Sequence, residues 1–148
     1  MVYVSIGGGG LISGIGSVLK AFSPKTRVVG VSAKNSAELA ASIRAGKMVK
    51  VDHHDTLADG CAGGGDSDTI TLGLGTEVID DLIDCSEKQI VSGLQQIAWS
   101  EKMLVEGSAG LAYAAWQEDA RKNNNKISAV VLCGANFDKE TLSPVVNL

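Results

Sequence analysis

The stretch VSIGGGGLISGIG, Val4–Gly16, decides the fold of this chain. Four consecutive glycines, Gly7 to Gly10, follow a short apolar run and precede apolar residues at helical spacing. Glycine loses more backbone entropy on folding than any other residue, so a run of glycines is costly unless the backbone needs it. A strand, a glycine turn and a helix N-terminus together present backbone N–H groups to an anion. The stretch therefore predicts a phosphate-binding turn, and a βα turn that binds no ligand is the alternative.

Strands and helices alternate along the rest of the chain. Apolar, β-branched runs predict strands at residues 2–6, 26–32, 82–86 and 127–134. Helical periodicity predicts helices at 11–21, 36–46, 86–104 and 108–122, with Ser36 and Ser86 as N-caps. Residues 51–75 are the least regular region. This alternation favours a single α/β domain over residues 1–148, a three-layer, mostly parallel sheet with helices on both faces. Ligands in such sheets bind beyond the carboxyl ends of the strands.

The composition argues against several classes of protein. The chain has 148 residues, of which 45% are hydrophobic and 20% charged, and its formal net charge is −4. This is the balance of an ordinary globular domain. Its 13 lysines and arginines are scattered, which argues against a nucleic-acid surface. No apolar run approaches the roughly 18 residues of a membrane span. Cys61, Cys85 and Cys133 are odd in number and far apart, which favours free thiols in the reducing cytoplasm.

Two common nucleotide-binding motifs do not fit the glycine run. A dinucleotide-binding turn needs G-x-G-x-x-G, but Ser13 occupies the third glycine position. The second predicted strand also ends at Ser32 rather than at the acidic residue that would bind a ribose. A Walker A loop needs lysine after its last glycine, whereas Gly10 is followed by Leu11.

Four motifs together point to a different phosphate ligand. The run GGGGLISG at residues 7–14 is followed by TLADG at 56–60, VEGSAG at 105–110 and VLCGAN at 131–136. In this order, over nearly the full chain, they resemble the C-terminal half of the fold type II (tryptophan-synthase-β-like) pyridoxal-phosphate enzymes. The nearest branch is the threonine and serine dehydratase and serine racemase group. The glycine run alone would not be specific, but the four motifs in order are.

The resemblance implies a pyridoxal phosphate cofactor and a role for each motif. Glu106 would lie near the cofactor ring, and Cys133, followed by Gly134, would face the pyridine nitrogen. A neutral thiol does not hold the pyridine nitrogen strongly protonated, so the ring withdraws electrons less strongly. This suits β-elimination of hydroxyl from serine or threonine. Without the surrounding motif, Cys133 is interpreted as a small buried hydrophobe. The cofactor phosphate would be held by backbone amides of the glycine loop, namely Gly7, Gly8, Gly9, Gly10 and Leu11.

The resemblance also implies a Schiff-base lysine upstream of the glycine run, in an S-x-K-x-R type of segment. Only six residues precede Gly7, and none is a lysine. We therefore expect a fragment of a β-eliminating, dehydratase-like lyase that lacks the N-terminal half with its lysine. Such a fragment keeps the phosphate loop and is inactive alone. The alternatives are a stand-alone small-anion-binding or interaction protein that reuses the half-fold, and one half of a split enzyme.

The missing half also bears on partners and metals. Its loss would expose apolar surface and a free strand edge, so we expect a homo-oligomer or a complex with a separate N-terminal half. Some family members bind a divalent cation through a glutamate after the second strand, where Ser32 and Ala33 stand here. His53 and His54 in VDHHD have no third ligand at a recognisable spacing, so a solvated loop is favoured and no metal is expected.

Overall fold

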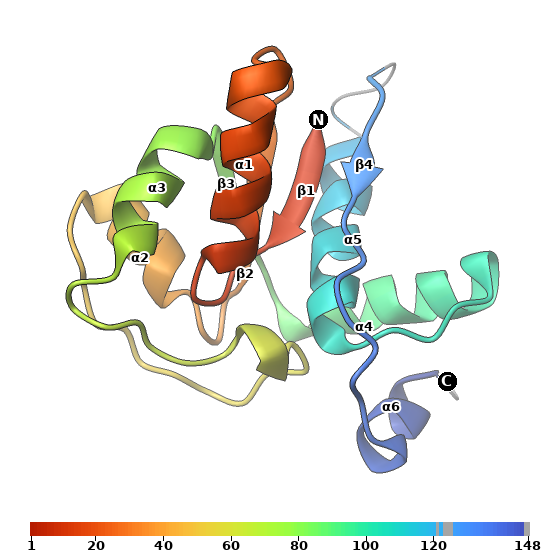
Figure 1. Ribbon diagram of the computed structural model, residues 1–148. Helices are drawn as coiled ribbons and strands as arrows, with labels where there is room; N and C mark the ends of the chain where they lie inside the picture. The colour runs from red at the N-terminus through yellow and green to blue at the C-terminus, as the bar shows by residue number, and fades with distance from the viewer. Residues whose placement is uncertain (121, 123–125, 147–148) are drawn as a thin grey trace.

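Strand β1 lies inside a parallel sheet of four strands in the order β3-β2-β1-β4. The computed structural model describes residues 1–120, 122 and 126–146. Each neighbouring pair of strands is parallel, and Ser5 at the end of β1 lies opposite Val31 of β2. Figure 1 shows the sheet between two groups of helices. The strands are β1 (Val2–Ser5), β2 (Val28–Ala33), β3 (Asp81–Cys85) and β4 (Ala129–Val130).

Side chains of the inner strands alternate between two apolar cores, one on each face of the sheet. Tyr3, Val29 and Val31 belong to the larger core, whereas Val4 and Val28 belong to the smaller one. All six residues of β2 are buried. This is the pattern of a parallel sheet covered on both faces, whose strands are apolar throughout.

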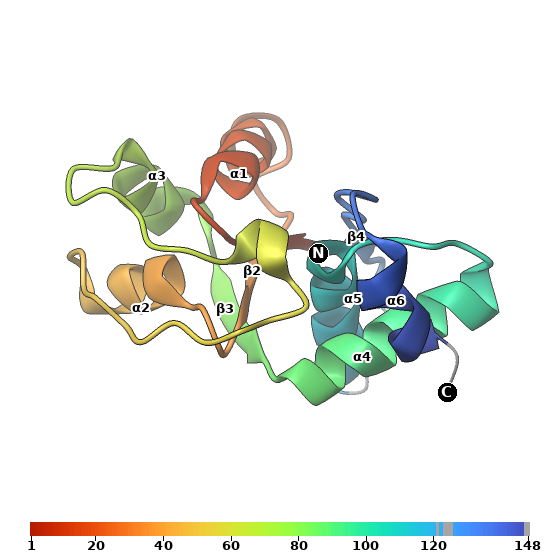
Figure 2. The ribbon, with the colours of Figure 1, turned by 90° about the horizontal axis from the view of Figure 1, so that it is seen from below.

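The smaller core is covered by the first three α-helices of the chain (Figure 2). Ile12 of α1 and Leu39 of α2 are buried in it, and Leu72 of α3 packs against it. These helices are α1 (Gly10–Phe22), α2 (Glu38–Ala45) and α3 (Ile70–Val78). A short 3-10 helix, η1 (Asp59–Cys61), precedes α3.

The remaining helices cover the opposite face of the sheet (Figure 2). Leu94, Leu111 and Leu142, from three different helices, meet in the larger core. The expected start of the first of these helices is confirmed, because Ser86 and Gln89 form a capping box. The elements are α4 (Glu87–Gln96), a π-helical turn η2 (Ile97–Glu101), α5 (Gly107–Ala120) and α6 (Lys139–Val146).

The predicted architecture is confirmed, and five of its details are wrong. The last strand is short, since the chain leaves the sheet toward Gly134, whose φ of 104° redirects it. The helix expected over 86–104 changes to π-helical geometry at Ile97 and ends before Lys102, which has a φ of 59°. Helix α3 was not expected in its glycine-containing sequence, nor was α6, which contains Pro144. Ala37, not Ser36, is the N-cap of α2.

The Ser36 hydroxyl instead joins a cluster that ties the loop after α2 to the start of that helix. Its oxygen lies 2.8 Å from Nδ1 of His53 and accepts from the N–H of Gly63 at 3.0 Å. The other imidazole nitrogen, Nε2, lies 3.1 Å from Glu38 Oε2, and the N–H of Gly65 donates to Glu38 Oε1 at 2.8 Å. One face of the expected solvated loop is therefore anchored, and that loop leads into η1.

Among the described residues, no helix has both the length and the apolar character that crossing a bilayer requires.

The Glu38 carboxylate generates the first prediction. The hydrogen bond from Gly65 and the contact with His53 lower the pKa of Glu38 below its ordinary 4.5. A lowered folded-state pKa contributes stability above the unfolded pKa, and that contribution is lost as pH falls through the folded value. We expect E38Q to reduce the free energy of unfolding by about 1–2 kcal/mol at neutral pH and by less in acid. Urea unfolding at both pH values measures this difference.

The control is E77Q, since Glu77 is exposed on α3. It is expected to leave the unfolding free energy within about 0.5 kcal/mol of the wild type at both pH values. An E38Q effect that is equally large in acid and at neutral pH would contradict the assignment of Glu38 as the source of the pH dependence.

Candidate functional site

The candidate site lies where the order of the sheet changes direction. From β1 the chain adds β2 and then β3 on one side, and only later returns to place β4 on the other side of β1. The loops after β1 and β4 therefore diverge to opposite faces and leave a crevice between them. Gly7–Gly10 follow β1 and Cys133 follows β4, so the fold brings these distant segments to one place.

The N-terminus of α1 faces this crevice and presents backbone N–H groups to it. Gly9 is its N-cap with a φ of 84°, and the N–H of Ser13 donates to the Gly9 carbonyl at 3.0 Å. The amides of Gly10 and Leu11 precede that bond, so they have no partner within the helix. No acidic side chain lies in the first turn and no side chain caps it. The positive end of the helix dipole is therefore uncompensated.

A pocket of about 250 Å³ extends from this glycine loop to the end of β4. Its lining is polar or backbone-rich at both ends and contains two thiols. The lining residues are Ser5, Gly7, Gly8, Gly9, Gly10, Leu11, Gly60, Cys61, Glu106, Ser108 and Cys133. Seven of the eight residues predicted for the site thus line one pocket, and Gly134 lies directly behind Glu106.

The end of the pocket opposite the glycine loop carries hydroxyl and thiol groups. Ser5 Oγ lies 2.9 Å from Cys133 Sγ. Burial raises the pKa of the Cys61 thiol, and the nearby hydroxyls of Ser108 and Ser5 partly oppose that rise. The Ser108 side chain is almost fully buried, and its oxygen makes no hydrogen bond of ordinary length to any described residue. This end therefore offers neutral groups with unused hydrogen-bonding capacity.

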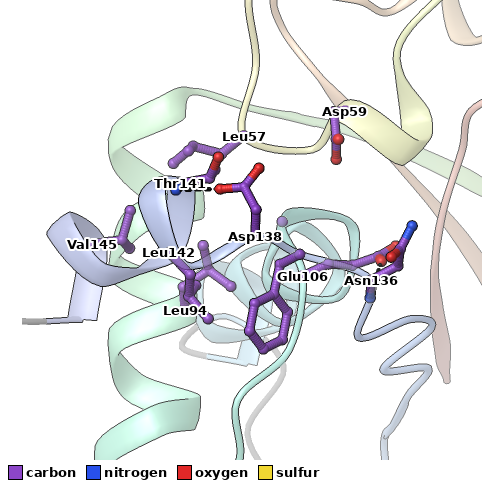
Figure 3. Close-up of a pocket in the computed structure, with 11 residues that line it drawn as sticks. Leu57, Asp59, Leu94, Glu106, Asn136, Asp138, Thr141, Leu142 and Val145 are labelled. Carbon is purple, nitrogen blue, oxygen red and sulfur yellow. Dashed lines mark hydrogen bonds between the residues drawn. The ribbon is translucent and has the colours of Figure 1, made fainter.

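Glu106 is held at the side of the pocket by the segment that follows β4. The Asn136 N–H donates to Glu106 Oε2 at 2.9 Å, and the Glu106 N–H donates to the Gly134 carbonyl at 3.3 Å. Glu106 also lines an adjoining cavity of about 50 Å³, together with Asn136, Asp59 and Leu142. Figure 3 shows Glu106 beside Asn136 there. The carboxylate thus separates this small cavity from the larger pocket and has a fixed orientation.

The pocket residues fit a flat ring that carries a phosphate. The glycine loop matches the anionic end, because a Cβ at Gly8 or Gly10 would meet no atom within 4 Å and the space before the amides is open. Ser5, Cys133 and the orphaned Ser108 hydroxyl match a neutral ring with polar edges. None of the residues that line the pocket is a lysine. Within the described ranges, no three histidine, cysteine or acidic residues are grouped so that they could hold a metal ion.

Four lining residues were missed at the sequence level. Ser5 lies in the strand before the glycine run and Ser108 lies in the VEGSAG motif, but the sequence assigned neither residue to the site. Gly60 is the last residue of the TLADG motif and Cys61 follows it, and that motif indicated a location but no role. Cys61 reaches the pocket because its backbone packs against Gly7, whose Cβ, if present, would approach the Cys61 Cα to 3.0 Å. Only the tertiary contact reveals it.

The fold and the pocket define an open α/β protein with a glycine loop and a helix N-terminus at its sheet switch point. The family described as pyridoxal-phosphate dependent enzyme matches residues 1–134. The chain therefore belongs to the pyridoxal-phosphate-dependent enzyme family.

Within this family, the chain is similar to threonine ammonia-lyases, threonine dehydratases and a serine racemase. The chain is 31% identical over 147 residues to an L-threonine ammonia-lyase of Thermotoga maritima, covering 99% of this chain and 36% of that protein. It is 32% identical to the catabolic L-threonine dehydratase of Escherichia coli, covering 97% of this chain and 44% of that protein. The serine racemase of Schizosaccharomyces pombe is 31% identical over 94% of this chain and 43% of its own length. The chain thus spans less than half the length of these relatives.

Solved structures agree with the sequence relatives. The processed form of threonine deaminase isoform 2 from Solanum lycopersicum superposes with a TM-score of 0.89 at 27% identity, over 99% of this chain and 43% of that chain. Maize serine racemase superposes with a TM-score of 0.83 at 28% identity, over 99% of this chain and 46% of that chain. These matches confirm the fold type II architecture and the resemblance to threonine dehydratase and serine racemase.

Gly134 generates the second prediction. Its φ of 104° is one that other residues rarely adopt, and an added Cβ would lie 2.3 Å from the carboxyl carbon of Glu106. Gly63 has a φ of 116° but open space around an added Cβ, so it is a matched control. We expect G63A to cost about 1–3 kcal/mol of unfolding free energy from backbone strain alone. G134A is expected to cost a further ~1–3 kcal/mol from the collision.

Chemical denaturation of both variants measures this difference. Equal losses in G63A and G134A would contradict a close contact between Gly134 and Glu106.

Proposed function

We propose that this chain supplies the phosphate loop and the ring-facing wall of a pyridoxal-phosphate-dependent lyase. The proposed reaction is β-elimination from a hydroxy-amino acid such as serine or threonine. The observation that carries the proposal is the single pocket in which the amides of Gly10 and Leu11 lie at one end and Cys133 at the other. Membership of the family and the names of its threonine- and serine-directed relatives support the cofactor and the substrate class.

In this proposal each pocket residue has a distinct task. The loop amides and the helix dipole bind the phosphate without a cationic side chain, so the anchor is not sensitive to protonation. Cys133 offers the ring nitrogen a neutral partner, and Glu106 limits the space beside the ring. Bound pyridoxal phosphate supplies the electron sink for the elimination. A neutral partner keeps that sink moderate, which favours loss of a β-substituent over more extensive carbanion chemistry.

The catalytic lysine is proposed to come from outside this stretch of sequence. No lysine lines the pocket, and a pyridoxal-phosphate enzyme needs one for covalent attachment and proton transfer. We therefore propose that the chain is inactive by itself and holds the cofactor by its phosphate alone. A segment that corresponds to the N-terminal half of the relatives would complete the site.

Exposed apolar side chains support association with such a half or with a second copy. Phe22 is 86% exposed and Ile127 94% exposed, and Trp99 and Leu104 are more than half exposed. Large exposed apolar side chains are typical of surfaces that bind other proteins. Sedimentation of the isolated chain is expected to give a dimer or larger species. A monomer at all concentrations would contradict self-association.

A stand-alone anion-binding protein is the alternative, since the same glycine loop would serve it. Absorbance spectra of the chain with added pyridoxal phosphate, before and after borohydride, test the main proposal. We expect binding that inorganic phosphate competes away and that borohydride does not fix to a lysine. A cofactor fixed to one lysine would overturn the proposed inactivity. Phosphate binding without any preference for the cofactor would favour the alternative.

A charge in the glycine loop generates a further prediction. An added Cβ at Gly10 has open space, and Gly10 is the first residue of α1. An aspartate there suits the helix dipole but repels a bound phosphate. We expect G10D to lower the affinity for phosphate and for pyridoxal phosphate at least about tenfold while retaining the wild-type melting temperature.

The matched control is G10N, which has the same shape without the charge. It is expected to keep both affinities within about threefold of the wild type. Equal loss of affinity in G10D and G10N would mean that side-chain volume, not charge, is responsible. No loss in either variant would place the anion elsewhere.

A further inference from the structure

Ser5 occupies a position between the sheet and the ring-facing end of the pocket. It is the last residue of β1, is 4% exposed, and lines the same pocket as the glycine loop. Its hydroxyl oxygen lies 2.9 Å from the Sγ of Cys133, which comes from the segment after β4. Pairing with β2 fixes the Ser5 backbone, because Ser5 is opposite Val31 and the next residue, Ile6, donates its N–H to the Val31 carbonyl. The hydroxyl is therefore presented to Cys133 by a rigid element.

The direction of the Ser5–Cys133 hydrogen bond decides what Cys133 can do. A thiol has one proton, and a hydroxyl has one proton and two lone pairs. If the Cys133 S–H donated to Ser5, its only proton would point toward the strand and away from a ring in the pocket. If the Ser5 O–H donates to Sγ, the Cys133 proton stays free for an acceptor in the pocket. Only the second arrangement provides a donor for a pyridine nitrogen.

A second thiol lies at the same end of the pocket. Cys61 comes from η1 and lines the same pocket as Ser5 and Cys133. Cys61 is buried and Cys133 is half-buried. The Ser5 oxygen has two lone pairs, so it can accept a hydrogen bond from another group while its own proton points to Cys133. Side chains from β1, η1 and the segment after β4 thus meet at one end of the pocket.

We propose that Ser5 is a positioning residue for Cys133, with its O–H donating to the Cys133 Sγ. The Ser5 hydroxyl fixes the rotamer of the Cys133 side chain and directs the S–H toward the ring nitrogen. This role rests on the proposed function, in which Cys133 faces the cofactor ring. In this role the end of β1 contributes to the ring site, whereas the glycine loop that follows β1 contributes to the phosphate site.

Thiol alkylation tests the coupling in the cofactor-free chain. Residue-resolved mass spectrometry follows iodoacetamide labelling of Cys133, with the buried Cys85 as an internal reference. A hydroxyl that donates to sulfur stabilises the thiolate, which is the reactive form. We expect S5A to slow Cys133 alkylation by about threefold to tenfold, the effect of one lost hydrogen bond. S5T, which keeps the hydroxyl, is expected to restore the rate.

The matched control is S32A, in the neighbouring strand. Ser32 is almost fully buried, and its hydroxyl has no hydrogen-bond partner among the described residues. It is expected to leave the Cys133 rate unchanged. An S5A variant in which the Cys133 rate is unchanged or faster, or in which Cys85 changes in parallel with Cys133, overturns the proposal.

Ligand affinities separate this proposal from the proposed function. The probes are inorganic phosphate and pyridoxine 5′-phosphate, whose alcohol group cannot react with lysines. We expect S5A to weaken pyridoxine phosphate binding by about threefold to tenfold and to leave phosphate binding unchanged. Equal weakening of both ligands overturns the role at the ring. If wild-type Cys133 is alkylated equally fast with and without bound pyridoxine phosphate, the ring-facing role of Cys133 fails, whatever the alkylation result for S5A.

Discussion

The pairing of β1 with neighbours on both sides is the constraint on which the rest of the structure depends. One neighbour, β2, is next in the chain, whereas the other, β4, is the last strand. This reversal at β1 leaves a crevice at its carboxyl end and directs the N-terminus of α1 toward it. It also brings Cys133, more than a hundred residues later, to within hydrogen-bonding distance of Ser5. Without the β1–β4 pairing, the glycine loop would have no opposite wall.

The pocket is divided electrostatically along its length. The end at the glycine loop consists of backbone amides and a helix terminus, which provide partial positive charge without a titrating side chain. The opposite end consists of thiols and hydroxyls, and burial raises the pKa of Cys61 so that its thiol stays neutral. Glu106 lies at the side of the pocket, where Asn136 and Gly134 fix its position. The proposed ligand, with an anionic end and an aromatic end, matches this division.

The loop between α2 and α3 links a stabilising polar cluster at the start of α2 to the pocket. Ser36, Glu38 and His53 anchor it to the start of α2, and it then forms η1, which carries Cys61 into the site. Residues far from the crevice thereby set the position of one of its thiols. Two kinds of interaction therefore position the site: the strand pairing that holds Ser5, and the polar cluster of Ser36, Glu38 and His53 that anchors the loop leading to η1. The second of these is sensitive to acid because it depends on an ionised carboxylate.

Local sequence determined the elements whose signals lie within one segment. The glycine run between an apolar strand and a periodic helix, the Ser86 and Gln89 capping box, and the alternation of strands with helices predicted the fold class and most of the site. Ser36 has the residue type of an N-cap, but its hydroxyl hydrogen-bonds with His53 instead, because tertiary contacts compete for it. Only the tertiary structure decided that Ser5, Cys61 and Ser108 join the pocket. Their positions depend on strand pairing and loop packing between segments remote in sequence, and such contacts leave no periodic signal in the chain.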